Sequence, residues 1–303
     1  MTNNFEAPKP KKKVLWRVIY PLLIWYGVEA LISFAYSIYF SIAYAIEVGF
    51  DSFGAYSEAL MEDMTNYIMQ KVNENSIMMT LLMDIITFGI LLLFYLADKK
   101  GKEADNPLAS PNIRKPIRYV CTATCAVGSC IGFNVVVSYI AAIFMSYGVN
   151  ISQTYEETQQ IVNMSNPVLI AIASVIVAPL AEEMIFRGMI FKRLRGRFGF
   201  AASAVISSVL FGLVHGNVIQ FIYAFAIGFM SACLFELTHE FFVSILFHMA
   251  ANLISEVLSL EAVTDYASNL MYGYTFFPCL VLCGIAVLTG ILAVKNSEKP
   301  LLK

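Results

Sequence analysis

The chain has 303 residues, of which 58% are hydrophobic and only 14% charged, and its mean hydropathy is +0.69. A soluble domain averages roughly 45–50% apolar and about 25% charged residues, so this composition excludes a water-soluble enzyme. It also excludes a disordered or collagen-like chain, because Gly (17) and Pro (10) are ordinary in number while Phe (23) and Tyr (16) are abundant. The formal net charge of −2 matters less than the distribution of charge along the chain.

The apolar residues form long continuous stretches, which excludes the alternating pattern of an outer-membrane barrel. A spanning helix needs about 20 predominantly apolar residues, and eight stretches are candidates. They are Val18–Val48, Ile77–Ala97, Arg118–Tyr147, Pro167–Phe191, Ala201–His215, Val218–Leu237, Phe241–Leu258 and Tyr274–Val294. The first and third are long enough to be tilted, and the fifth is short. The sequence therefore predicts an all-α, polytopic membrane protein with eight transmembrane helices around a hydrated cavity.

Lysine and arginine are concentrated in alternate loops. All except Lys71 and Arg187 lie before the first span, between the second and third or at the first residue of the third (Arg118), after the fourth, or after the last. The remaining loops are acidic. Basic loops stay in the cytoplasm, so eight spans predict a cell-membrane protein with both termini cytoplasmic. No cleavable signal peptide is expected, because Pro8–Lys13 leads into an apolar stretch that is too long for one.

We expect one integrated membrane domain in three parts. Residues 1–165 hold spans one to three with the inner basic loops, residues 166–258 hold the polar motifs described below, and residues 259–303 hold the last span and the tail. Short amphipathic surface helices are predicted within Asp51–Ser76 and Gln153–Val162. The six cysteines lie in spans without a Cys-x-x-Cys pair and are interpreted as small apolar fillers. No nucleic-acid partner is expected, because the basic residues follow one membrane face.

Span four contains three charged residues in the segment Ala181–Gly188. A charged group at the bilayer centre costs at least about 2.5–3.5 kcal/mol and marks function by default. Glu183 and Arg187 are four residues apart, so they can form an ion pair on one helix face. Glu182 lies about 100° further round the helix and has no local partner. We therefore interpret Glu183 as structural and Glu182 as the available carboxylate.

The polar residues that can join Glu182 are two histidines and an asparagine. His215 ends span five, and His248 lies in span seven with Asn252 one turn beyond it. The helical rise places Glu182 about 16 Å, His248 about 12 Å and His215 about 21 Å from the inner surface, so only His215 departs from a common depth. Asp84 and Glu256 are further acidic residues in or near spans. Glu256 can orient Asn252, and Asp84 is assigned no role.

Two chemistries remain open for this set of side chains. A carboxylate and a histidine can activate water while histidine and asparagine donors stabilise an oxyanion. Alternatively, Glu182, His215 and His248 can hold Zn²⁺ with an open position for water. Both lead to hydrolysis of an amide bond. The purely structural alternative is that the histidines are satisfied within the bundle and that Asn252 forms an interhelical hydrogen bond.

Three motifs occur in order on successive late spans: Glu-Glu-x-x-x-Arg at 182–187, Phe-x-x-x-His at 211–215 and His-x-x-x-Asn at 248–252. Together they resemble the CPBP intramembrane proteases, which include the type II CAAX prenyl endopeptidases (Ras-converting enzyme) and bacterial Abi or bacteriocin self-immunity proteins. The resemblance covers about Pro167–Ser255. It implies an eight-helix bundle whose conical cavity opens towards the cytosolic side.

The resemblance also implies roles for individual residues. Glu182 and His215 would activate water, and His248 and Asn252 would form the oxyanion hole. The supporting residues would be Glu183, Arg187 and Phe211. This mechanism requires no cofactor, and Zn²⁺ is its alternative.

The expected partners are the lipid bilayer and a peptide or protein substrate, with or without an attached lipid. One functional alternative is a non-catalytic immunity or scaffold protein that binds a peptide in the same fold. The other is a proton-coupled transporter, since intramembrane Glu and His residues also serve that purpose.

Overall fold

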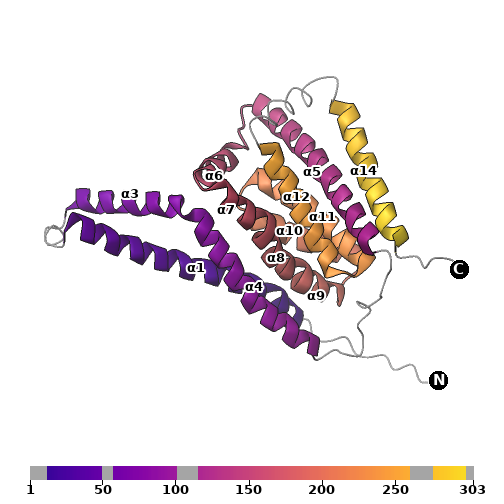
Figure 1. Ribbon diagram of the computed structural model, residues 1–303, viewed down its shortest axis with the longest axis horizontal. Helices are drawn as coiled ribbons and strands as arrows, with labels where there is room; N and C mark the ends of the chain where they lie inside the picture. The colour runs from indigo at the N-terminus through magenta and orange to yellow at the C-terminus, as the bar shows by residue number, and fades with distance from the viewer. Residues whose placement is uncertain (1–11, 50–56, 101–114, 260–275, 298–303) are drawn as a thin grey trace.

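The computed structural model describes residues 12–49, 57–100, 115–259 and 276–297, and every regular element within these ranges is a helix (Figure 1). The all-α class is therefore confirmed for the described residues. The helices are α1 (Lys12–Val48), α3 (Glu58–Glu74), α4 (Ser76–Lys100), α5 (Lys115–Ser146), α6 (Gln153–Asn163), α7 (Pro167–Ala171), η1 (Ile172–Val177), α8 (Ala178–Glu183), η2 (Met184–Phe191), α9 (Lys192–Arg195), α10 (Phe200–Leu213), α11 (Val218–Thr238), α12 (Phe241–Ser259) and α14 (Phe276–Ser297).

Six helical segments of the described chain are long and apolar enough to cross a membrane. They are Leu15–Val48, Ser76–Ala97, Pro116–Ser146, Pro167–Arg195, Val218–Thr238 and Phe241–Ser259. Phe200–Leu213 and Cys283–Leu292 are shorter apolar helices. Helices suit this setting because they satisfy their own backbone hydrogen bonds in lipid. The protein is thus a polytopic helical membrane protein. Each predicted stretch overlaps one of these helices, while eight crossings stay a prediction.

The segment Pro167–Arg195 forms one irregular helical rod made of α7, η1, α8, η2 and α9. Its start is capped by Asn166, whose side chain accepts hydrogen bonds from two backbone N–H groups of the first turn. The segments η1 and η2 are π-helical and flank α8, which carries Glu182 and Glu183. Pro179 in α8 has no N–H and disturbs the preceding turn, which accounts for the irregularity of η1.

Helices α1, α3 and α4 form a unit that we call the arm. In Figure 1, α1 and α3 run side by side and extend away from the other helices. The phenol of Tyr44 on α1 donates to Asp63 on α3 at 2.6 Å, and its ring lies 5.3 Å from that of Tyr67. The surface helices predicted within Asp51–Ser76 and Gln153–Val162 are confirmed as α3 and α6, although residues 51–56 lie outside the described ranges.

The remaining helices, from α5 to α14, form the core. Helices α5 and α14 pack closely because two glycines leave room for the facing backbone. A Cβ atom at Gly290 would lie 2.7 Å from the Cβ of Cys125, and one at Gly128 would lie 2.8 Å from the Cβ of Ala286. Small residues at such crossings allow close contact between helices in lipid. The described cysteines are free thiols within these helices, in agreement with their predicted role as fillers.

Candidate active site

Glu183 is fully buried and is bound by side chains from three segments of the core. Its Oε1 accepts from Arg187 of the same rod at 2.9 Å and from Nδ1 of His248 on α12 at 3.1 Å. Its Oε2 accepts from the hydroxyl of Ser231 on α11 at 3.0 Å and from that of Ser244 on α12. A buried carboxylate is tolerated when its lone pairs are matched in this way. Glu183 therefore joins the rod to α11 and α12.

Arg187 carries the ion pair that was expected from its spacing to Glu183. Its Nη2 donates to the carbonyl oxygen of Gly228 on α11 at 2.6 Å, and its guanidinium lies 4.8 Å from the centre of the Phe211 ring. This approach needs glycine at 228, because a Cβ there would lie 2.9 Å from Nη2 of Arg187 and from Cδ1 of Phe211. The helix α11 and the two serines were not predicted as parts of this network.

Among the described residues, Glu182 has no hydrogen bond to that network, and its side chain is 13% exposed. Its Oε2 lies 3.6 Å from Nε2 of His248, which is too far for a direct hydrogen bond. One water molecule can nevertheless contact both atoms at about 2.8 Å by sitting beside the line that joins them. The two neighbouring carboxylates thus differ in their surroundings: Glu183 accepts hydrogen bonds from four side chains, and Glu182 lines a cavity.

His215 reaches the site because α10 is short. The helix has 14 residues, about 21 Å of rise, so it ends within a bilayer core of about 30 Å. The chain then turns at Gly216, whose φ of +78° favours glycine, and α11 begins after its cap residue Asn217. The depth of His215, which the sequence left open, is therefore set by this turn inside the bundle.

The ring of Phe211 lies between the two imidazoles. Its centre is 4.9 Å from that of His215 and 5.5 Å from that of His248, edge to face in both cases. Nδ1 of His215 lies 2.7 Å from the carbonyl oxygen of Phe211. A carbonyl only accepts, so this nitrogen carries the proton and Nε2 of the neutral ring is an acceptor. Phe211 is therefore the predicted wall and also orients His215.

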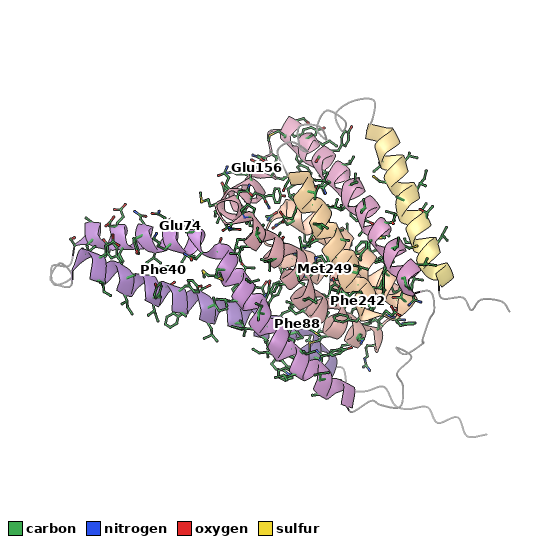
Figure 2. The ribbon with its side chains drawn as sticks, viewed as in Figure 1. Phe40, Glu74, Phe88, Glu156, Phe242 and Met249 are labelled. Carbon is green, nitrogen blue, oxygen red and sulfur yellow. The ribbon has the colours of Figure 1, made fainter. Side chains whose placement is uncertain are left out.

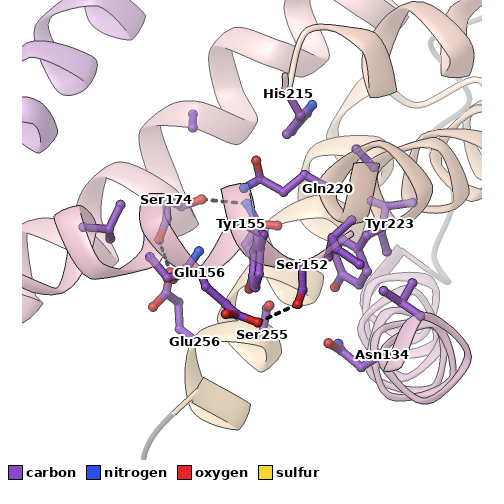
Figure 3. Close-up of a pocket in the computed structure, with 18 of the residues that line it drawn as sticks. Asn134, Ser152, Tyr155, Glu156, Ser174, His215, Gln220, Tyr223, Ser255 and Glu256 are labelled. Carbon is purple, nitrogen blue, oxygen red and sulfur yellow. Dashed lines mark hydrogen bonds between the residues drawn. The ribbon is translucent and has the colours of Figure 1, made fainter. Parts of the chain in front are cut away.

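Asn252 is held through the irregular start of the rod. Its Nδ2 donates to the carbonyl oxygen of Ser174 in η1 at 2.8 Å. The hydroxyl of Ser174 in turn donates to Glu256 at 2.9 Å, as Figure 3 shows. Glu256 was expected to orient Asn252, and Ser174 connects the two residues through these hydrogen bonds. An amide has two N–H groups, so the second remains for another acceptor.

A cavity of about 720 Å³ brings the four predicted catalytic residues together. Glu182, His215, His248 and Asn252 all line it, and so does Phe211. Glu183 and Arg187 lie behind this wall, where they support it. Polar residues from α5, α6, α11 and α12 complete the lining and were not predicted as site residues; they include Asn134, Tyr155, Gln220, Tyr223 and Ser255 (Figure 3). Burial and the nearby carboxylate of Glu256 raise the pKa of Tyr155 on α6.

Asp84 is a buried acid beside the site that the sequence analysis left without a role. It lies on α4, is 2% exposed, and interacts electrostatically with Glu182. Within the described residues, its Oδ1 has no hydrogen-bond partner. The signal that identified Glu182, an acid inside an apolar span, applies equally to Asp84 and was available from the sequence.

The zinc alternative requires three ligands around one ion. In the part of the chain that the structure describes, no three His, Cys, Asp or Glu side chains are grouped to share a metal ion. In addition, Asn252 is a poor zinc ligand. This donor set does not fit zinc, so no step below passes through a metal.

Residues 164–254 match the model of the Rce1-like family, type II CAAX prenyl endopeptidase Rce1-like. This segment is therefore similar to that family. The match includes all three motifs, and it confirms the family resemblance predicted from them.

The chain is also similar to a protein of Bacillus subtilis (strain 168) named "Putative membrane peptidase YdiL". The two are 36% identical over 128 residues, which are 42% of this chain and 52% of that protein. The chain thus matches about half the length of this relative. No solved structure matches.

Proposed function

We propose that this protein is an intramembrane endopeptidase that cleaves a peptide bond of a membrane-associated protein or peptide. The observation that carries the proposal is the convergence of Glu182, His215, His248 and Asn252, from three separate helical segments, on one cavity. The Rce1-like match and the peptidase name of the Bacillus relative support the same reaction class.

In the proposed reaction, Glu182 is the general base. A water molecule beside Glu182 donates one proton to its carboxylate while the water oxygen attacks the carbonyl carbon of the peptide bond. Nε2 of His215 accepts the second hydrogen bond of this water and orients it. Glu182 then returns the proton to the amine that leaves, so the protons balance over one turnover. A positioned base of this kind contributes about 10²–10⁴ to the rate.

The oxyanion of the intermediate is assigned to His248 and Asn252. Nδ1 of His248 donates to Glu183, so Nε2 can donate to an oxyanion only when the ring carries both protons. The free N–H of Asn252 is the second donor. Loss of one donor of an oxyanion hole costs about 10²–10³ in rate. Glu183 acts here as a positioning residue, because it fixes the orientation of His248 without touching the substrate.

The test measures cleavage by the purified full-length chain in detergent, on matched peptides with and without a C-terminal isoprenoid. We expect Glu182→Ala to lower kcat by at least about 100-fold with an unchanged melting temperature. Glu157→Gln is the matched control, because Glu157 on α6 is exposed and does not line the cavity. Comparison of the two peptides shows whether the lipid is needed.

Full activity of Glu182→Ala would contradict the proposal. Peptide binding that survives Glu182→Gln, without cleavage by the wild type, would favour the non-catalytic immunity or scaffold alternative.

We further propose a cell-membrane location with both termini in the cytoplasm, on the basis of the basic loops.

A further inference from the structure

The lining of the cavity comes from one end of every helix that contributes to it. Helix α5 contributes residues near its carboxyl end, such as Met145, and α12 contributes Asn252, Ser255 and Glu256 near its own carboxyl end. The rod contributes its first half, up to Glu182. Helix α11 contributes its first turns, and α6 lies beside these helix ends (Figure 1).

The basic residues lie at the opposite ends of the same helices. The rod ends in Lys192, Arg193 and Arg195, and α5 begins at Lys115. Glu182 lies about 22 Å from the start of the rod and about 20 Å from Arg195. The cavity therefore occupies one half of the membrane thickness, and the basic ends mark the other half.

Exposure along the lining shows which way the cavity opens. The deepest residues are buried: Phe211 is 1% and His248 3% exposed, whereas Met145 is 52% exposed. Between Glu182 and the basic end of the rod, every residue of η2 from Met184 to Phe191 is buried. These side chains close the path from Glu182 along the rod to its basic end.

The mouth is also polar and acidic. Glu156 and Glu256 line it, held by the hydroxyls of Ser152 and Ser174 respectively (Figure 3). Among the described lining residues there is no lysine or arginine. Further acidic residues on α3 and α6 extend the negative charge over the side of the molecule on which the mouth lies. Clefts lined by one sign of charge raise the local concentration of opposite charge.

We propose that the cavity takes its substrate from the side of the membrane opposite the basic loops, the outer side of the cell membrane, and that the substrate is a positively charged peptide segment. Basic loops remain in the cytoplasm, so the cytosolic opening implied by the family resemblance and the cytoplasmic location of the basic ends cannot both hold. The cavity lining lies at the helix ends opposite the basic residues. If the basic ends are cytoplasmic, the cavity therefore opens to the outer side. The proposal of a peptide substrate rests on the proposed function, whereas the side of access does not.

The side of access is tested by cysteine labelling in intact cells. Gln159→Cys places a thiol at the mouth, and Phe198→Cys places one in the turn at the basic end; the parent chain measures the background from native cysteines. A membrane-impermeant maleimide should label Gln159→Cys in intact cells and Phe198→Cys only after permeabilisation. The reverse pattern would overturn the proposal, whatever the protein's activity.

The substrate is tested with a soluble fluorogenic peptide rich in lysine and arginine. Right-side-out membrane vesicles should cleave it and inverted vesicles should not; cleavage by inverted vesicles alone would overturn the proposed side. Absence of cleavage even by the detergent-solubilised chain would contradict the proposed function and leave the labelling result standing.

The charge preference is tested by comparing Glu156→Gln with its neighbour Glu157→Gln, which lies outside the cavity lining. Glu156→Gln should raise the KM for the basic peptide about two- to fivefold, the effect of one exposed charge pair, with kcat unchanged and a neutral peptide unaffected. An equal effect of both substitutions would show that the mouth does not recognise the charge.

Discussion

The arm and the core place their side chains in opposite ways. In the arm, 22% of the most apolar window of α1 is buried, against 44% for α11 in the core. Large apolar residues of α1 such as Leu31 and Phe34 are 70% and 65% exposed, and side chains project from both sides of the arm in Figure 2. In the core, Glu183 and Arg187 have no exposed surface.

This comparison shows what holds a membrane protein together once it is in lipid. Lipid tails are as apolar as leucine, so burying apolar side chains between helices provides little hydrophobic driving force. Close packing and matched polar groups supply the specificity instead. The core uses both. The arm packs on the core mainly along the rod, where Val18 and Leu91 share a buried apolar cluster with Phe186, and much of the rest of its apolar surface faces outward. Stability should therefore depend far more on the core network than on the exposed face of the arm.

The largest effect is expected for Glu183→Ala. It removes the partner of a buried guanidinium and leaves Arg187 charged without its carboxylate, which costs about 3–5 kcal/mol. The expected result is a low yield of folded protein and a strongly reduced melting temperature in detergent. Glu182→Ala is the matched control, since Glu182 lies outside the network, and it should melt like the wild type. Equal melting temperatures for the two variants would contradict the separation of a structural from an available carboxylate.

A smaller effect is expected for Gly228→Ala in the core. The added methyl group would meet Arg187 and Phe211 at 2.9 Å, and overpacking of this kind costs about 1–3 kcal/mol. Gly89→Ala on α4 of the arm is the control, because nothing lies within 4 Å of its added Cβ. Alanine stabilises a helix interior over glycine by about 0.5–1 kcal/mol, so the two changes should shift the melting temperature in opposite directions. Shifts of the same sign would refute the contrast.

The smallest effect is expected for Phe34→Ala on the exposed face of α1. Surface substitutions away from special features usually change stability by less than about 0.5 kcal/mol. The same substitution at Phe186 in the rod removes a fully buried ring and should cost about 3–5 kcal/mol. Thermal unfolding of both variants in one detergent measures the difference. A large loss for Phe34→Ala would indicate that the arm face packs against another protein surface.

The sequence predicted those features of the site that depend on one segment alone. The ion pair of Glu183 with Arg187 follows from a spacing of four residues on a helix, and the separate direction of Glu182 follows from the helical turn. The motifs that identified the family are also local. By contrast, Ser231 and Ser244 were not predicted as partners of Glu183, because serine is common in apolar helices and carries no local sign of what it faces.

The apolar stretches by themselves determined that this is a helical membrane protein, since lipid leaves a long apolar segment few ways to satisfy its backbone. Only the tertiary structure decided that His215 meets His248 around Phe211, that Asn252 binds Ser174, and that the cavity occupies the half away from the basic ends. These depend on which helix faces meet and where α10 stops, and such contacts join residues far apart in the chain. Helix propensity and periodicity describe one segment at a time, so they do not predict contacts between distant segments.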